Sequence, residues 1–156
     1  MAPESPPKHS NPPEGWPQIS SCVVYERPVE ALAWLEEAFG FATRVRVEDG
    51  DGRLVHSELE LGSGLVMLSG VQPQRRFQSP RALGGQNTQS LYVFVDDVDA
   101  HCRRARAAGA TILQEPETRH YGDRLYGCLD CEGHTWFFGQ RLADPQPPGH
   151  ETETAS

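Results

Sequence analysis

The sequence predicts an α+β protein made of two copies of one βαβββ module. Three observations support this: short strand-like runs, two stretches with helical spacing, and the same order of both on either side of an irregular segment at 69–89. Runs rich in β-branched and aromatic residues are typical of strands, and apolar residues three and four apart are typical of a helix. Aligning the two helices puts Tyr25 opposite Val95, an offset of 70 residues.

The first module is predicted at about 16–70. A strand at 19–25 leads into a helix with apolar residues spaced along 31–39. Pro28 suits the first turn of that helix, and Gly40 suits its end. Turns rich in Gly and Asp then separate three further predicted strands, at 45–47, 54–61 and 65–68.

The second module, at about 88–142, follows the same order. A strand at 90–95 precedes Asp96 and Asp97, which suit a helix N-terminus by capping and by charge. An apolar stripe follows, and Gly109 ends the helix. The later strands are predicted at 111–113, 125–129 and 135–138.

The two ends differ from the rest in composition. Eight of the 13 prolines lie in 1–15 and 143–156, where large apolar side chains are nearly absent. Such segments cannot bury enough surface to offset the entropy of ordering, so we predict disordered tails. The remainder, 16–142, is predicted to be a single domain whose two modules are joined by a linker at 71–87.

Composition narrows the class of protein. The 156 residues are 37% apolar and 23% charged, which is typical of a soluble globular chain. No run approaches the roughly 20 apolar residues of a membrane span, and the start lacks the apolar core of a secretory signal. The net charge of −8 disfavours nucleic acid and anionic membranes as partners. We therefore expect a cytoplasmic protein and a neutral or cationic small-molecule ligand.

Three stretches carry a resemblance to a known family: WLEEAFGF at 34–41, VDDVDAHCRRARAAGA at 95–110 and YGDRLYGCLDCEGHTWFFG at 121–139. With the repeated module, they resemble the vicinal-oxygen-chelate superfamily, which includes glyoxalase I, extradiol dioxygenases and bleomycin-resistance proteins. The last stretch is most similar to the bleomycin-resistance branch. The resemblance implies that each module curls into a cup and that paired cups enclose a cavity, within one chain or between swapped partners of a homodimer.

The resemblance also implies where a metal would bind. In metal-dependent members, the first and last strand of each half supply one ligand each, usually His or Glu. The matching positions here are Ser20, Val66, Ser90 and Phe137. Hydroxyl and hydrocarbon groups bind divalent cations poorly, so we expect no metal and no other cofactor. A register shift of one residue does not help, because it gives Ser21, Leu65, Met67, Leu91, Trp136 or Phe138.

Strand alternation predicts what lines the cavity instead. If the two serines face it, so do alternate residues of the same strands, and aromatic walls suit a flat organic ligand. The alternative is that the rings fill the cup as core. The predicted lining is Ser20, Cys22, Val24, Ser90, Tyr92, Phe94 and Phe137.

His56, Glu58 and Glu60 alternate along one predicted strand and share one of its faces. A His with two carboxylates could bind metal or serve as acid and base, whereas the simpler interpretation is a solvated sheet face. We expect Glu58 to reach the cavity, where it could hold a cationic ligand.

A loop at 119–124 precedes a strand, and its His120 is a candidate ligand contact. The alternative is a structural loop fixed by an Asp123–Arg pair and a turn at Gly122. Cys128 and Cys131 form a C-x-x-C, but a zinc site needs four ligands and a redox pair usually begins a helix, so we expect reduced, inactive thiols.

Together these features favour a metal-independent small-molecule binding protein. The resemblance names an antibiotic of the bleomycin type as a ligand, held stoichiometrically and kept from its target. The alternatives are a metal-dependent lyase or dioxygenase of the same superfamily, and a scaffold whose filled cup serves only dimer contacts.

Overall fold

The structure, a computed structural model, describes residues 9–144. Most of the two predicted tails therefore lies outside the described residues. Within them, the carbonyls of Glu14 and Gly15 accept hydrogen bonds from the guanidinium of Arg44, at 3.1 and 2.9 Å. Neither of the two α-helices in the described range is long and apolar enough to span a membrane.

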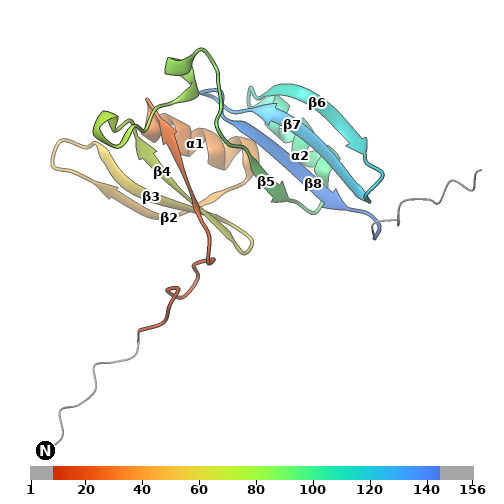
Figure 1. The fold of residues 1–156 in the computed structure, drawn as a ribbon, viewed down its shortest axis with the longest axis horizontal. Coiled ribbons are helices and arrows are strands. Elements are labelled where there is room, and N and C mark those ends of the chain that lie inside the picture. Colours follow the sequence, from red (N-terminus) through yellow and green to blue (C-terminus); the bar gives the residue numbers. More distant parts are fainter. Residues whose placement is uncertain (1–8, 145–156) are drawn as a thin grey trace, which may run out of the picture. The chain divides into compact units, whose positions relative to one another are not determined.

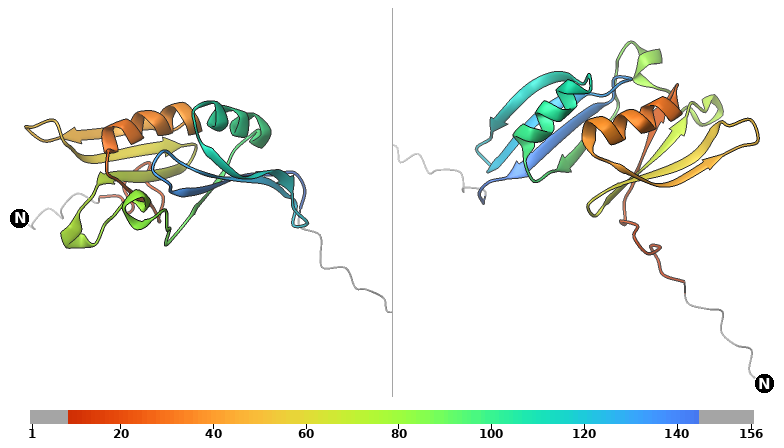
Figure 2. Two further views of the ribbon diagram at one scale, coloured as in Figure 1. Left: turned by 90° about the horizontal axis from the view of Figure 1, so that it is seen from above. Right: turned by 180° about the vertical axis from the view of Figure 1, so that it is seen from behind.

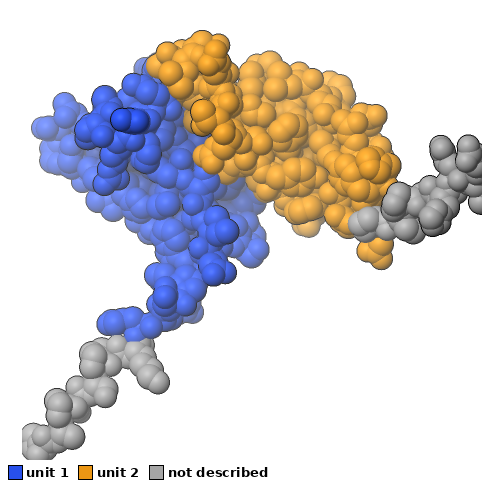
Figure 3. Space-filling view, viewed as in Figure 1, with its two compact units in different colours: residues 1–36, 40–78 blue, residues 37–39, 79–156 orange. Residues whose placement is uncertain are grey.

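The chain forms two compact units (Figure 3). Each unit has its own four-stranded sheet. Unit 1 includes residues 40–78 and the chain up to 36; unit 2 includes 37–39 and the chain from 79 onward. The two sheets have the same strand order, β1-β4-β3-β2 and β5-β8-β7-β6 (Figure 1). The α+β fold of two βαβββ modules predicted from the sequence is confirmed.

Unit 1 begins with strand β1 (Ser21–Tyr25) and helix α1 (Pro28–Phe39), whose last three residues, 37–39, belong to unit 2. Pro28 occupies the first turn of the helix, and Gly40 ends it with a left-handed φ of 81°, which a glycine adopts without strain. The strands that follow are β2 (Ala42–Glu48), β3 (Leu54–Leu61) and β4 (Gly64–Gly70).

Unit 2 repeats this order, with β5 (Leu91–Phe94) followed by α2 (Val98–Ala107). The carboxylate of Asp97 caps α2 by accepting a hydrogen bond from the backbone N–H of Ala100, at 3.0 Å. The remaining strands are β6 (Thr111–Thr118), β7 (Asp123–Leu129) and β8 (Thr135–Arg141). Strand β6 is longer than the sequence predicts, and its pairing with β7 continues past two β-bulges.

The predicted linker forms two short 3₁₀-helices, η1 (Pro73–Arg75) and η2 (Pro80–Leu83). Ser79, just before η2, is fully buried and donates a hydrogen bond to Glu132 at 2.6 Å. The second half of the segment is thus anchored to unit 2.

Each helix lies against one face of a sheet (Figure 2). In unit 1 the core beneath α1 includes Val23, Tyr25, Leu59 and Leu68, all almost completely buried. In unit 2 it includes Tyr126, Trp136 and Phe138 beneath α2. Phe39, the last residue of α1, belongs to unit 2, and its ring packs on Phe138 in the same unit at a centroid distance of 4.7 Å. The other face of each sheet, which points away from its helix, is not part of these cores.

Candidate functional site

In unit 2, the sheet face away from α2 carries three aromatic rings. Tyr92 pairs with Phe137 across β5 and β8, and Phe94 lies two residues further along β5. Since their neighbours Trp136 and Phe138 are core, alternation puts these three rings on the other side. We call Tyr92, Phe94 and Phe137 the ring face. The prediction that these three residues share one sheet face away from the helix is confirmed.

The ring face is open in the described chain. Tyr92 is 45% exposed and Phe94 is 58% exposed, and their ring centroids lie 5.3 Å apart at 57°. Phe137 is partly exposed. Large exposed apolar side chains that lie side by side mark a binding surface more often than isolated ones do.

Two strand glycines allow the rings to lie close to the backbone. A Cβ atom on Gly127 would come within 2.9 Å of the Phe137 ring, and one on Gly139 within 2.6 Å of the Tyr92 hydroxyl. Both distances are too short for a real contact, so any side chain there would push the rings away. A glycine inside a strand often marks such a close approach.

The Tyr92 hydroxyl is fixed at one end of the ring face. It donates to Oδ2 of the buried Asp123 at 3.1 Å, and Oδ1 of Asp123 pairs with Arg141 at 2.5 Å. Burial and the hydrogen bond to Asp123 raise the pKa of Tyr92 to about 12. Tyr92 is therefore protonated at neutral pH and serves as a positioned, uncharged ring.

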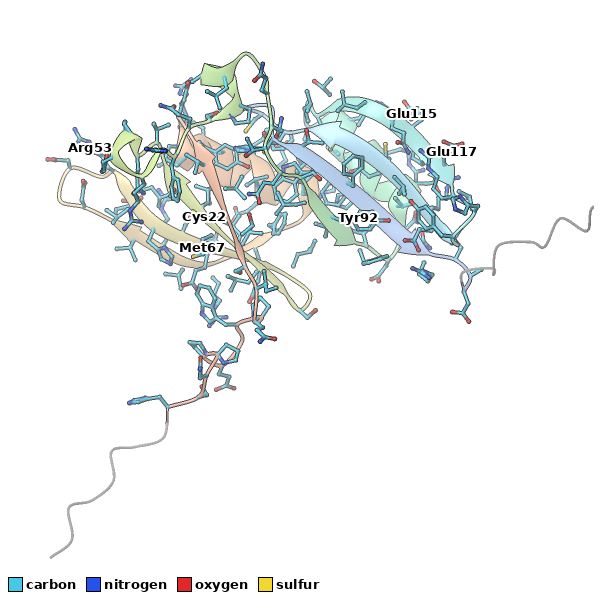
Figure 4. The ribbon with its side chains drawn as sticks, viewed as in Figure 1. Cys22, Arg53, Met67, Tyr92, Glu115 and Glu117 are labelled. Carbon is cyan, nitrogen blue, oxygen red and sulfur yellow. The ribbon has the colours of Figure 1, made fainter. Side chains whose placement is uncertain are left out.

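Unit 1 presents different chemistry at the equivalent positions (Figure 4). Cys22 pairs with Met67, where unit 2 has Tyr92 and Phe137. The Cys22 thiol lies 3.6 Å from the Ser69 hydroxyl, and the Ser20 hydroxyl donates to the Leu65 carbonyl at 2.5 Å. This face thus carries sulfur and hydroxyl groups in place of rings.

Glu58 lies on the same face of unit 1, as predicted, but it already has two partners. It pairs with Met67 across β3 and β4 and is only 8% exposed. Its Oε1 lies 3.0 Å from Nε2 of His56, and its Oε2 lies 3.6 Å from Nε of Arg44. The carboxylate charge is therefore compensated within the unit, while Glu60 is exposed at the next position on this face.

None of the four family metal positions carries an imidazole or a carboxylate group. Val66 pairs with Ser21, so it faces the helix, and its predicted place beside Ser20 is wrong by one residue; Leu65 and Met67 share the face of Ser20 instead. Phe137 does lie on the predicted face, beside Tyr92. Within residues 9–144, no group of three or more His, Cys, Asp and Glu side chains is arranged to hold a metal ion.

The remaining predicted residues lie in the β6–β7 turn, on β7 and the turn after it, and just before β5. His120 is exposed in the β6–β7 turn, where its ring stands at 82° to that of Tyr121. Burial raises the pKa of both Cys128 and Cys131 to about 12, so these thiols stay protonated. Ser90 precedes β5 and is exposed.

Sequence reasoning missed the groups that shape the ring face: Gly127, Gly139, Arg141 and Gln114. Gly127 carried a signal, because it interrupts the predicted strand at 125–129, whereas Gly139 directly follows the predicted strand at 135–138. Gln114 carried none, since it lies beyond the predicted strand at 111–113. It pairs with Gly127, which places it on the ring face.

Comparisons with known proteins agree with this architecture. A family model described as Glyoxalase/Bleomycin resistance protein/Dioxygenase superfamily matches residues 19–138. Uncharacterized protein Mb0911c of Mycobacterium bovis is 34% identical over 131 residues, which are 82% of this chain and 86% of that protein.

Solved structures give the same result. TioX from Micromonospora sp. ML1 is 34% identical, with a TM-score of 0.65 over 80% of this chain and 98% of TioX. A glyoxalase/bleomycin resistance protein/dioxygenase family enzyme from Burkholderia phytofirmans PsJN shares the fold at 20% identity, with a TM-score of 0.63 over 79% and 97% of the two chains. The chain belongs to the glyoxalase/bleomycin resistance protein/dioxygenase superfamily.

Proposed function

We propose that this protein binds a flat organic molecule on the ring face of unit 2, without a resident metal. The observation that carries the proposal is a pair of exposed rings, Tyr92 and Phe94, on a sheet whose glycines make room for aromatic side chains. Aromatic surfaces attract flat ligands by stacking and by removing apolar area from water.

The charges on both sheet faces favour an uncharged ligand. Asp123 is paired with Arg141, and Glu58 is paired with Arg44. A cationic ligand at Glu58 would have to compete with that arginine, whereas a neutral ligand on the ring face competes with no charge. A buried or stacked neutral molecule also avoids the cost of desolvating an ion.

The superfamily name supports a more specific version of the proposal. Its bleomycin-resistance members suggest an antibiotic as the ligand, bound one-to-one and thereby withheld from its target. A homodimer, expected from the resemblance, and a cytoplasmic location, expected from the composition, belong to the same proposal. Sedimentation of the purified protein tests the dimer.

The binding experiment uses 2-acetylnaphthalene, a flat neutral ketone, and follows backbone amide shifts by NMR. We expect saturable shifts in the amides of β5, β7 and β8, and a weaker affinity for Phe94→Ala. Val55→Ala is the matched control, because Val55 is 55% exposed on a strand of the other unit. No saturable binding, or equal losses in both variants, would overturn the proposal.

Metal analysis tests the rival class directly. The rival is a metal-dependent lyase or dioxygenase, and it requires ligands other than Ser20, Val66, Ser90 and Phe137. We expect purified protein to contain no stoichiometric zinc, nickel, iron or manganese and to bind the naphthalene ketone equally well after chelation. One tightly held metal ion per chain would favour the rival.

A further inference from the structure

We infer that Gln114 selects ligands that carry a hydrogen-bond acceptor, such as a carbonyl oxygen, at the edge of the stacked ring. The inference rests on the proposed function, because it assigns the polar contact of the same site. Its basis is the environment of one side-chain amide.

The amide nitrogen of Gln114 is buried and has no hydrogen-bond partner among the described residues. A buried N–H group without a partner is costly, and nearly all such groups in native proteins are satisfied by protein, water or ligand. The group that satisfies this donor is therefore one that the chain itself does not supply within 9–144.

The position of Gln114 points to the ring face. Gln114 pairs with Gly127, and Gly127 pairs with Phe137 on its other side. A Cβ atom on Gly127 would meet both the Phe137 ring and the Gln114 Cβ, the latter at 3.8 Å. The amide thus shares one face with the aromatic rings.

The local backbone explains why the amide is placed there. The register of β6 shifts between Ile112 and Gln114, and again between Gln114 and Glu117. β-Bulges redirect side chains and are common beside functional sites. Here one bulge lies on each side of Gln114, which is the β6 residue that pairs with Gly127 of β7.

Unit 1, the other copy of the module, carries a side chain at the position equivalent to Gly127. In unit 1 the equivalent row is Cys22, Met67, Glu58 and Val45, so Glu58 takes the place of Gly127. Glu58 is held there by His56 and Arg44. In unit 2 the glycine removes that side chain, and the Phe137 ring lies over the glycine instead, next to Gln114. The unpartnered amide is therefore at the edge of an aromatic ring, where a ligand stacked on that ring could reach it when the ring shifts.

The arrangement of the rings and the Gln114 amide indicates the chemical class of the ligand. A molecule stacked on Phe137 and Tyr92 would present its edge to Gln114, and the amide N–H donates. The ligand must therefore combine a flat apolar body with an acceptor at its rim. An aromatic ketone, amide or lactam has this combination, whereas a plain hydrocarbon does not.

The test compares two probes of nearly the same shape, 2-acetylnaphthalene and 2-isopropenylnaphthalene, which differ by C=O against C=CH2. We expect wild type to bind the ketone about three- to tenfold more tightly, the value of one neutral hydrogen bond. In Gln114→Met the ratio should fall to about one. The control Gln86→Met, at an exposed loop position, should keep the wild-type ratio.

A second measurement separates a ligand contact from a structural role. If the amide lacks a protein partner, Gln114→Met should not lower the melting temperature, because no internal hydrogen bond is lost. A ratio that survives in Gln114→Met, or a drop of several degrees in its melting temperature, would overturn the inference. Should that variant fail to fold, Gln114→Ala serves for the same ratio.

The remaining outcomes distinguish the inference from the proposed function. Equal affinity of both probes for wild type would overturn the role of Gln114, as expected if a water molecule permanently satisfies the amide, and would leave stacking on the ring face intact. Binding of neither probe would overturn both.

Discussion

Replacing Phe94 with Ala tests whether the ring face is a binding surface or part of the core. Phe94 is 58% exposed, so folding buries less than half of it. Complete burial of a Phe side chain stabilises a protein by about 1.5–3 kcal/mol, and burial of less than half by about 1 kcal/mol. Its contact with Tyr92 adds at most about 1 kcal/mol at a partly exposed site.

The expected loss for Phe94→Ala is therefore at most about 2 kcal/mol. Phe138→Ala is the matched core variant on the neighbouring strand, since Phe138 is completely buried against α2 and Phe39. Truncating a buried Phe costs about 3–5 kcal/mol. Because the two phenylalanines lie on opposite faces of one sheet, we expect the two variants to lose clearly different amounts of unfolding free energy.

Urea denaturation followed by circular dichroism measures this difference. With a slope of about 2 kcal/mol per molar urea, Phe138→Ala should lower the midpoint by about 1.5–2.5 M and Phe94→Ala by less than about 1 M. Phe94→Ala should also weaken binding of the naphthalene ketone. If both variants lose the same stability, the ring face is core and the reasoning is refuted.

Three further predictions follow from individual contacts. Gly139→Ala should displace Tyr92 and break its hydrogen bond to Asp123, so the pKa of Tyr92 should fall from about 12 towards 10; an unchanged ring titration by NMR would contradict this. Burial lowers the pKa of His101 below 6.5, so the unfolded chain takes up a proton first as the pH falls. Neutral His101 therefore stabilises the fold above pH 6.5, and this contribution is lost as the pH falls below 6.5. We expect the melting temperature, measured between pH 7.5 and 5, to fall less steeply for His101→Asn than for wild type. Parallel slopes for the two proteins would contradict this prediction. Glu58→Gln should cost about 1–3 kcal/mol, because the half-buried Arg44 loses its counter-charge, without changing the relative affinity for cationic and neutral probes. A selective loss of the cationic probe would make Glu58 a ligand contact instead.

The fold could be predicted from the sequence because its signals are local and occur twice. Strand alternation, helical spacing and the terminating glycines, such as Gly40 and Gly109, depend on neighbours within a few residues. The repeat offset of 70 residues then predicted the same order of elements along the chain in both modules. The placement of Tyr92 and Phe94 on one face followed from alternation, and that of Phe137 from the metal position that the resemblance implies.

The partners of those side chains depended on strand register, which the sequence does not reveal. A shift of one residue exchanges the two faces of a strand, and it placed Val66 wrongly. The bulge near Thr43 brings Arg44 to Glu58, and the two bulges around Gln114 bring its amide to the ring face. Bulges arise from the pairing of whole strands, so they appear only when the sheet is assembled.

The sequence by itself determined which residues of a regular strand share a face, because side-chain direction alternates along the strand. Only the tertiary structure decided which of their polar groups are already satisfied. Glu58 is compensated by Arg44, and Asp123 by Arg141, whereas the amide nitrogen of Gln114 has no partner in the described chain. The physical reason is that hydrogen bonds and ion pairs join atoms a few ångströms apart, and these distances are set by the packing of segments far apart in the sequence.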